Sequence, residues 1–308
     1  MEAVLGANGK KAAVMRVRGT TKLLCVIGCP VEHTLSPYIH QILIDHAGDD
    51  FAYVPFRVEK ENVHEAIQGA LALGIEGINV TIPHKQAVMA ETVSLDFSAK
   101  LVGAVNTLKK TPEGYVGYNT DVDGFGKLVD IGQVPVKGNP VLILGAGGAA
   151  RSAVAVSFLK GASEIRIWNR TRKRAEDLKA EFEATLRALG ENVPAIRVLS
   201  DEALLEEDHA IVFNTTSAGM YPKTETLPVE AEAFYQAVRF GLDMVFNPAE
   251  TGFMRKIREN GGFALGGRSM LFYQGMRSYE IWTGREFFKA QADQMHEAFL
   301  KVSEEVLS

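Results

Sequence analysis

One short segment limits the possible folds of this 308-residue chain more than any other. Gly145-Ala146-Gly147-Gly148-Ala149-Ala150 fits the pattern G-x-G-x-x-[GA], with the apolar run VLIL before it and the small-residue run ARSAVAVSFL after it. The first glycine permits a tight turn, the second lets backbone approach a pyrophosphate, and Ala150 lets the helix pack closely on the strand. The segment therefore predicts a dinucleotide-binding strand–turn–helix unit; a turn that binds no ligand is the disfavoured alternative.

The residues at the end of the next predicted strand, EIRIWNR, indicate whether the dinucleotide is NAD or NADP. An NAD-selective site places Asp or Glu there, about 20 residues after the glycines, to bind the ribose 2′-hydroxyl. This chain has Asn169, Arg170, Thr171 and Arg174 instead, and Arg151 lies at the start of the fingerprint helix. A guanidinium can bind a 2′-phosphate through two hydrogen bonds, and a threonine can add a hydroxyl donor. We therefore predict NADP(H) rather than NAD, against the alternative of a solvated basic helix start.

Short apolar runs alternate with amphipathic segments along the chain, which is typical of α/β folding with mostly parallel sheets. LLCVIG, FAYVPFRV and GINVTI are predicted strands, and two strand-like pieces around Pro112-Glu113-Gly114 predict a hairpin. AIRVLS, HAIVFNTT, GLDMVF and FALGG continue the rhythm of the second half and predict a second parallel sheet. After Gly267 the pattern turns helical, and the loop over 131–139 is a predicted domain junction.

Composition excludes several classes of function. Charged residues make up 23% of the chain and the net charge is −5, so no basic excess indicates nucleic acid. No apolar run approaches the roughly 18 residues that span a bilayer, and the first residues lack the pattern of a signal peptide. Cys25 and Cys29 are too far apart on a strand to form a disulfide, and no zinc-ligand spacing is present. We therefore expect buried thiols, a cytoplasmic location and no metal.

Polar residues interrupt or end several apolar strands of the first half. Asn79 and Thr81 share one face of the strand in GINVTIPHK, and Lys85 follows just after the proline. Asn106 and Asp121 end two further apolar segments. Because ligands in open α/β sheets bind beyond the carboxyl ends of strands, these groups predict a site for a polyhydroxylated small molecule. Lys85 suits its acid/base and Asp121 the orienting carboxylate.

A purely structural explanation also exists for Lys85 and for a pair of hydroxyl residues, Thr34 and Ser36. Lys85 stands at a predicted helix start, where a solvated side chain is common and where the helix dipole disfavours a cation. Thr34 and Ser36 are two hydroxyls that can jointly hold a small carboxylate, and Pro37 follows them. Taken alone, Ser36 is better explained as the N-cap of a helix.

Nine ordered motifs between about Lys22 and the C-terminus resemble the shikimate dehydrogenase family, which includes the quinate/shikimate dehydrogenases. The motifs are GCPVEHTLSP, GINVTIPHK, GAVNTL, NTDVDGFG, GAGGAAR, NRT, NTTSAGM, DMVFNP, and MLFYQGM followed by EIWTG. The resemblance implies an N-terminal α/β substrate-binding domain (22–125) after a lead-in segment (1–21), and a Rossmann NADP-binding domain (126–270). It also implies C-terminal helices (271–308) that pack back on the first domain.

The resemblance also implies roles for matching residues. Lys85 and Asp121 match the catalytic pair, with Lys85 as general acid/base. Thr34 and Ser36 match the pair that holds the substrate carboxylate. Four residues match positions that bind substrate hydroxyls: Asn79, Thr81, Asn106 and Gln274. The implied cofactor contacts are Gly145, Ala146, Gly147, Gly148, Ala149, Arg151, Asn169, Arg170, Thr171, Arg174, Thr216, Met220 and Gly241, the last two at the nicotinamide end.

The implied reaction is the reversible NADP-dependent reduction of 3-dehydroshikimate, a cyclohexenoid acid, to shikimate. We expect the chain to be a monomer or homodimer. Two departures from the family pattern concern the substrate: Thr34 replaces a serine, and Phe246 lacks a phenol that often contacts the substrate carboxylate. A third, Val-Asp-Gly after Asn-Thr-Asp, leaves the catalytic pair intact. A quinate-preferring or analogue-specific enzyme therefore stays an alternative. A non-catalytic dinucleotide sensor is disfavoured because Lys85 and Asp121 are both present.

Overall fold

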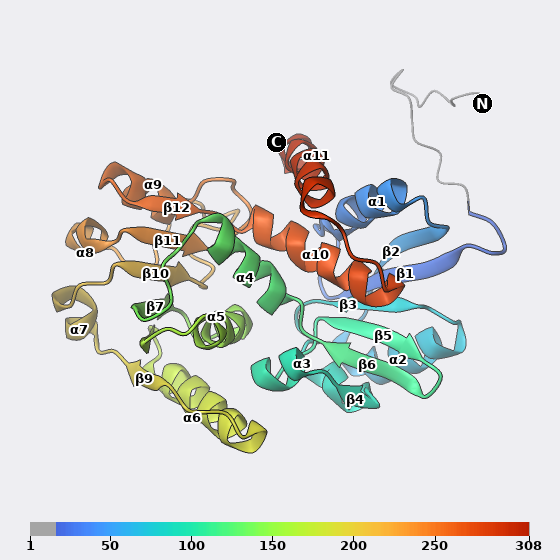
Figure 1. Ribbon diagram of the computed structural model, residues 1–308, viewed down its shortest axis with the longest axis horizontal. Coiled ribbons are helices and arrows are strands. Elements are labelled where there is room, and N and C mark those ends of the chain that lie inside the picture. The colour runs from blue at the N-terminus through green and yellow to red at the C-terminus, as the bar shows by residue number, and fades with distance from the viewer. Residues whose placement is uncertain (1–16, 308) are drawn as a thin grey trace.

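Two six-stranded sheets lie side by side in the computed structural model, which describes residues 17–307 (Figure 1). Most of the lead-in segment predicted over 1–21 therefore lies outside the described residues. Helix α4 (Asp121–Ile131) leads from the first sheet to the second, and α10 (Arg268–Thr283) leads back. The predicted boundaries after residues 125 and 270 fall inside these two helices, and the division into domains stays a prediction.

The first sheet has the order β2-β1-β3-β5-β6-β4. Strand β1 runs parallel to its neighbours β2 and β3, whereas β5 is antiparallel to both of its neighbours. The predicted hairpin is confirmed as β5 and β6, which pair Thr111 with Gly114 across the turn. The elements are β1 (Lys22–Gly28), α1 (Ser36–Ala47), β2 (Phe51–Arg57), η1 (Lys60–Asn62), α2 (Val63–Ala72), β3 (Gly77–Val80), η2 (Ala87–Glu91), β4 (Ser94–Leu95), α3 (Phe97–Val102), β5 (Thr107–Thr111) and β6 (Gly114–Tyr118).

The second sheet is entirely parallel in the order β12-β11-β10-β7-β8-β9. This is the order of doubly wound dinucleotide-binding sheets, with the crossover between β7 and β10. The elements are β7 (Pro140–Leu144), α5 (Gly148–Leu159), β8 (Glu164–Trp168), α6 (Arg172–Leu189), β9 (Ala195–Val198), α7 (Asp201–Glu206), β10 (Ile211–Asn214), α8 (Glu232–Ala237), β11 (Phe240–Asp243), α9 (Gly252–Glu259) and β12 (Phe263–Leu265). The predicted Rossmann fold is confirmed.

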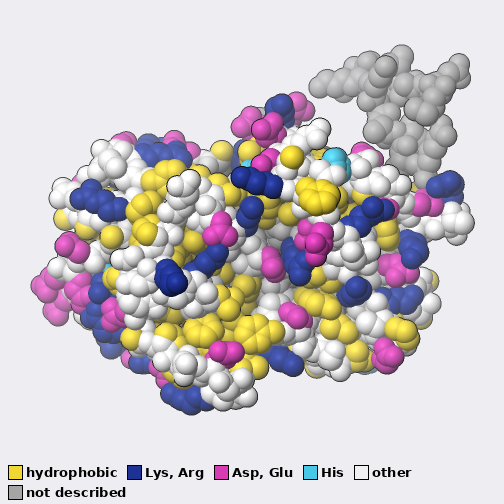
Figure 2. Space-filling view, viewed as in Figure 1, with side chains coloured by type: hydrophobic (Ala, Val, Ile, Leu, Met, Phe, Trp, Pro, Cys, Tyr) yellow, Lys and Arg dark blue, Asp and Glu magenta, His cyan; other side chains and the backbone are white. Residues whose placement is uncertain are grey.

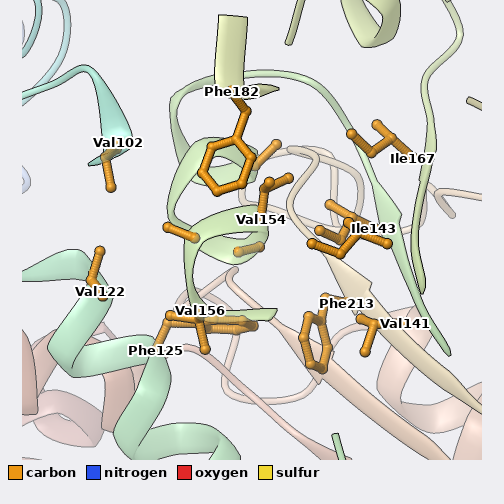
Figure 3. Close-up of a cluster of buried hydrophobic side chains, with 14 of the residues drawn as sticks. Val102, Val122, Phe125, Val141, Ile143, Val154, Val156, Ile167, Phe182 and Phe213 are labelled. Carbon is orange, nitrogen blue, oxygen red and sulfur yellow. The ribbon is translucent and has the colours of Figure 1, made fainter. Parts of the chain in front are cut away.

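Strand β7 is apolar on both faces because helices cover both sides of its sheet. Val141 and Ile143 belong to one buried cluster, and Leu142 and Leu144 belong to another. Figure 3 shows the first cluster, in which Phe125 of α4 and Phe213 of β10 pack edge to face. The same cluster includes Val102 of α3, so apolar packing continues from the Rossmann sheet into the first unit.

The C-terminal helices return to the first sheet, as predicted. Helix α10 packs on α4 and α1, and α11 (Lys289–Leu307) packs on α1 and α10. Trp282 in the last turn of α10 donates its indole N–H to the Leu108 carbonyl of β5 at 2.9 Å. The far end of the chain therefore supports the strands from which the polar residues project.

The two cysteines differ from the sequence prediction in one respect. Cys25 lies within β1 and is buried, and burial raises the pKa of its thiol to about 12. Cys29 is only half-buried, and its thiol donates to a carboxylate oxygen of Glu59 at 3.1 Å. The prediction of two buried thiols is therefore wrong for Cys29, because the chain leaves the sheet after Gly28.

Candidate active site

A cleft of about 250 Å³ opens beyond the carboxyl ends of β1 and β3. All eight residues predicted to be catalytic or to bind substrate line it: Thr34, Ser36, Asn79, Thr81, Lys85, Asn106, Asp121 and Gln274. Thr34 and Ser36 lie between β1 and the start of α1, and Asn79, Thr81 and Lys85 lie in β3 and the turn that follows it. Asn106 directly precedes β5, Asp121 begins α4, and Gln274 lies in α10. Residues far apart in the sequence therefore meet at one site.

Lys85 and Asp121 form an ion pair in this cleft, with Nζ and Oδ2 2.6 Å apart. The two side chains are 28% and 14% exposed, so the pair is partly shielded yet open to a ligand. Asp121 is the first residue of α4, where the helix dipole favours a carboxylate. Lys85 lies in a turn before the five-residue 3₁₀ helix η2, so the predicted helix start at Lys85 is wrong.

Asp121 is held in place by an amide whose orientation is fixed. Asn106 donates from Nδ2 to Asp121 Oδ1 at 3.0 Å, while Asp121 Oδ2 accepts from Lys85. The backbone N–H of Thr120 donates to Asn106 Oδ1 at 2.8 Å. Because a backbone N–H can only donate, the oxygen of Asn106 faces Thr120 and its nitrogen faces Asp121.

Asn79 lines the cleft but has its polar atoms occupied by the protein. Its Oδ1 accepts from the Tyr53 hydroxyl at 2.8 Å and from His40 Nε2 at 3.0 Å. Its Nδ2 donates to Ser278 Oγ at 3.0 Å and to Thr107 Oγ1 at 3.2 Å. Burial lowers the pKa of His40 to about 3, so this imidazole is neutral at physiological pH. Asn79 thus anchors a buried network at the cleft wall.

Thr81 differs from Asn79 in this respect. Its side chain is half-buried, and its hydroxyl has no hydrogen-bond partner among residues 17–307. A Cβ at Gly28 would lie 2.3 Å from Thr81 Cγ2, so only glycine lets the end of β1 pass this threonine. Thr81 therefore presents a free hydroxyl to the cleft.

Thr34 and Ser36, which also line the cleft, form a hydroxyl pair with their oxygens 3.1 Å apart. Helix α1 begins at Ser36 with Leu35 as its N-cap residue, and no side chain caps it. The N-cap prediction for Ser36 is therefore wrong; instead the Ser36 backbone N–H donates to Thr34 Oγ1 at 3.2 Å. Phe246 lines the cavity as well.

Part of the cleft wall is apolar and was not predicted from the sequence. Val31, Leu35 and Leu271 line the cavity beside the hydroxyl pair. These residues give no signal in the sequence, because apolar side chains of a cleft and of a core have the same pattern.

The turn between β7 and α5 has room for a ligand. Gly145 has φ +113°, and a Cβ there would lie 2.5 Å from Thr215 Oγ1, so a glycine is required. Gly147 and Gly148 are exposed, and a Cβ on either would have no heavy atom within 4 Å. Helix α5 begins at Gly148 without a side-chain cap, so its first N–H groups are available to a pyrophosphate. The turn therefore fits a dinucleotide.

The basic cluster at the start of α6 divides into paired and unpaired cations. Arg172 pairs with Glu176 at 2.9 Å and Lys173 pairs with Asp177 at 2.6 Å, each one helical turn away. The guanidinium groups of two exposed residues have no hydrogen bond or ion pair in the described part of the chain: Arg170 and Arg174. Both guanidinium groups are therefore available to bind a phosphate.

The remaining predicted cofactor residues have different surroundings. Asn169 donates to the Thr171 carbonyl at 2.9 Å and shapes the loop after β8. Arg151 forms an ion pair with Glu181 of α6, so its guanidinium is already engaged. Thr216 donates to Asn214 Oδ1 at 2.7 Å at the end of β10. Met220 follows in the same connection and is 41% exposed.

Gly241 was predicted to contact the nicotinamide end of the cofactor, and its place in the structure argues against this. It lies inside β11 opposite Val212 and is buried. A Cβ there would lie 2.2 Å from Ile257 Cδ1 of α9, so the glycine serves close packing between strand and helix. Its position within the strand, rather than at the carboxyl edge, removes it from the region where the cofactor is expected.

Basic and acidic side chains are interspersed on the face shown in Figure 2. No helix within residues 17–307 is long and apolar enough to cross a membrane. Over the same residues, no group of three or more His, Cys, Asp or Glu is arranged to hold a metal ion.

A Rossmann sheet beside a polar cleft that contains a lysine–carboxylate pair defines a two-domain dinucleotide-dependent oxidoreductase. Three family models match the chain: "Shikimate dehydrogenase substrate binding domain" over residues 26–108, "Shikimate / quinate 5-dehydrogenase" over 129–223, and "Shikimate 5'-dehydrogenase C-terminal domain" over 267–298. The chain belongs to the shikimate dehydrogenase family.

Individual relatives agree with this assignment. The shikimate dehydrogenase (NADP(+)) of Carboxydothermus hydrogenoformans is 37% identical over 270 residues, which cover 88% of this chain and 94% of the relative. The shikimate 5-dehydrogenase of Listeria monocytogenes, solved with shikimate and NAD, is 28% identical with a TM-score of 0.82, covering 92% and 98% of the two chains. The Thermus thermophilus enzyme, solved with NADP(H) and shikimate, is 28% identical with a TM-score of 0.78, covering 91% and 100%.

Proposed function

We propose that this chain catalyses the reversible, NADP-dependent reduction of 3-dehydroshikimate to shikimate, a step of aromatic amino acid biosynthesis. The observation that carries this proposal is the Lys85–Asp121 pair, 2.6 Å apart in a cleft lined by hydroxyl and amide groups. A carbonyl that becomes a hydroxyl needs a proton donor within hydrogen-bond reach, and an ammonium group held by a carboxylate is such a donor.

The cleft supplies groups for each part of a hydroxylated cyclohexene acid. Thr34 and Ser36 offer hydroxyl donors for the carboxylate. Thr81 and Gln274 offer contacts for ring hydroxyls, and Asn106 lies next to Asp121 at the reacting end. Lys85 donates its proton to the carbonyl oxygen, and Asp121 orients the ammonium group.

The residues of the Rossmann unit fit NADP(H), which supplies the hydride when it is bound. The turn at residues 145–148 offers open space and free N–H groups to the pyrophosphate. Within residues 17–307, the guanidinium groups of Arg170 and Arg174 are unpaired where a 2′-phosphate is expected, and residues 169–174 after β8 include no Asp or Glu. Thr216 and Met220, after β10, are proposed to lie at the nicotinamide end.

The test of this function is an absorbance assay of NADPH oxidation with 3-dehydroshikimate, and of NADP and NAD reduction with shikimate and quinate. Lys85→Ala should lower kcat by at least about 100-fold while the Kd for NADPH stays nearly unchanged. Lys100→Ala, which removes an exposed lysine of α3, is the matched control and should keep full activity. Unchanged turnover of Lys85→Ala would overturn the role of Lys85, and faster turnover of quinate would favour the quinate alternative.

We further propose that the chain acts in the cytoplasm as a monomer or homodimer. The support for the compartment is the presence of two free thiols, Cys25 and Cys29, which suit a reducing environment. Light scattering on the purified chain measures the assembly, and a tetramer or larger species would contradict this proposal.

A further inference from the structure

A serine of helix α10 joins the polar side chains behind the cleft wall. Ser278 is fully buried. Its Oγ lies 3.0 Å from Asn79 Nδ2, 2.8 Å from Thr107 Oγ1 and 3.1 Å from Thr120 Oγ1. It also donates to the backbone carbonyl of Gln274 at 3.0 Å. One hydroxyl therefore connects the C-terminal helix with three segments of the first unit.

The hydrogen atoms in this cluster can be assigned from the chemistry of its members. A hydroxyl has one proton and two lone pairs. The Gln274 carbonyl can only accept, so it takes the proton of Ser278, and the Asn79 amide nitrogen can only donate, so it uses one lone pair. The second lone pair accepts from one threonine hydroxyl. The nearest remaining acceptor for the other threonine is Asn106 Oδ1, 3.0 Å from Thr107 and 3.2 Å from Thr120, whereas the Thr107–Thr120 and Thr120–Gln274 Oε1 distances are longer, at 3.3 and 3.5 Å.

This assignment links Ser278 to the proposed catalytic pair. Thr120 Oγ1 accepts from Asn106 Nδ2 at 3.0 Å, and the same nitrogen donates to Asp121 Oδ1 at 3.0 Å. The other oxygen of Asp121 holds the ammonium group of Lys85. A continuous series of buried or half-buried hydrogen bonds thus runs from α10 to the acid/base.

We propose that Ser278 is a positioning residue that holds Asn106, and through it Asp121 and Lys85, in the reactive geometry. Without Ser278 Oγ, the nearest acceptor for both threonine hydroxyls is Asn106 Oδ1, which already accepts from the Thr120 N–H and has only two lone pairs. The amide of Asn106 is then no longer fixed, and its hydrogen bond to Asp121 weakens. Partners in a buried network support one another in this way. The inference rests on the proposed function of the Lys85–Asp121 pair.

The first test is Ser278→Ala, measured with 3-dehydroshikimate and NADPH. We expect kcat to fall about fivefold, as for the loss of one coupled interaction, while KM for NADPH changes by less than about twofold. Ser157→Ala is the matched control, because Ser157 is also fully buried and donates to the carbonyl four residues earlier at 2.8 Å. Ser157 Oγ has no second partner in the described chain, so its loss should affect the melting temperature and leave kcat unchanged. An unchanged kcat in Ser278→Ala would overturn the proposal.

A double-mutant cycle tests whether Ser278 acts through Asn106. In an Asn106→Ala background, Ser278→Ala should lower the residual kcat by less than about twofold, because the link is already broken. A fivefold loss in both backgrounds would overturn the proposed route, since it would show that Ser278 acts independently of Asn106. A merely structural role would lower the melting temperature without this dependence on Asn106.

Misfolding of the variant, failure of this inference and failure of the proposed function give different results. If Ser278→Ala does not fold, as judged by circular dichroism, Ser278→Cys replaces it, because a thiol fills a similar volume and is only a weak donor and acceptor; an unchanged kcat there would also overturn the proposal. If the wild-type chain turns over 3-dehydroshikimate but both Ser278 variants match it, only this inference fails. Absence of wild-type turnover would overturn the proposed function and this inference together.

Discussion

Lys85 and Asp121 lie 36 positions apart in the chain, yet their side chains meet at 2.6 Å. Lys85 follows β3, whereas Asp121 opens the helix that leads to the Rossmann unit. The contact therefore places the proposed acid/base at the start of the helix that joins the two units.

Asp121→Asn keeps the size of the side chain and removes its charge. We expect kcat to fall by about 10- to 100-fold, because the ammonium group of Lys85 loses its orienting partner. Steady-state kinetics with 3-dehydroshikimate measures the effect. Asp130→Asn, on the same helix, is the control. The Asp130 carboxylate lies 2.6 Å from Lys160 Nζ, and neither residue lines the cleft. Equal kcat values for the two variants would contradict a role of Asp121 in the reaction.

Arg170 and Arg174 should determine the preference for NADP. Changing both to alanine is expected to raise KM for NADP by about 30-fold or more while KM for NAD changes little, because each guanidinium contributes charge-assisted hydrogen bonds to a phosphate. The matched control is Arg172→Ala with Lys173→Ala, which removes two cations that are already paired. A similar loss of NADP affinity in the control would show that net charge, rather than these two residues, sets the preference.

Asp243 should make stability depend on pH. Burial raises the pKa of this carboxyl group to about 6 from 3.8, although Thr251, Val245 and Asn214 donate hydrogen bonds to it. The folded state therefore binds more protons than the unfolded state between these values, so the contribution of Asp243 to stability is present below pH 3.8 and is lost as the pH rises through 6.

Asp243→Asn removes this titration. The unfolding free energy of the wild type minus that of the variant should decrease by about 2 kcal/mol between about pH 4.5 and 7. Urea unfolding at several pH values measures the difference. A difference that stays constant, or that increases with pH, would contradict the raised pKa.

Phe246 is expected to influence the affinity for the substrate carboxylate. Phe246→Tyr adds a hydroxyl to a side chain that lines the cleft beside Thr34 and Ser36. We expect KM for shikimate to fall by about three- to tenfold, since a hydrogen bond to a charged group contributes about 1.5 kcal/mol or less under partial exposure. Phe288→Tyr, at a 79% exposed position, is the control. An unchanged or higher KM would indicate that the phenol has no access to the carboxylate.

The sequence by itself determined the elements whose signals are local. The glycine pattern at 145–150, bounded by an apolar run and a small-residue helix, predicted the β7–α5 unit, because turn conformation and close packing depend on the residues at the turn itself. The hairpin of β5 and β6 and the alternating strands and helices were predicted for the same reason. The family motifs added the set of residues that line the cleft.

The tertiary structure decided which polar groups are free and which are already bonded. Asn79 and Thr81 are indistinguishable in the strand pattern, yet Asn79 is bonded to Ser278, 199 positions away, whereas the Thr81 hydroxyl faces the cleft. Gly241 and Ser36 were misassigned because their neighbours, Ile257 and Thr34, are set by the packing of α9 on β11 and by the path of the chain before α1. Hydrogen-bond partners between distant segments depend on strand order and helix packing, which local periodicity does not encode.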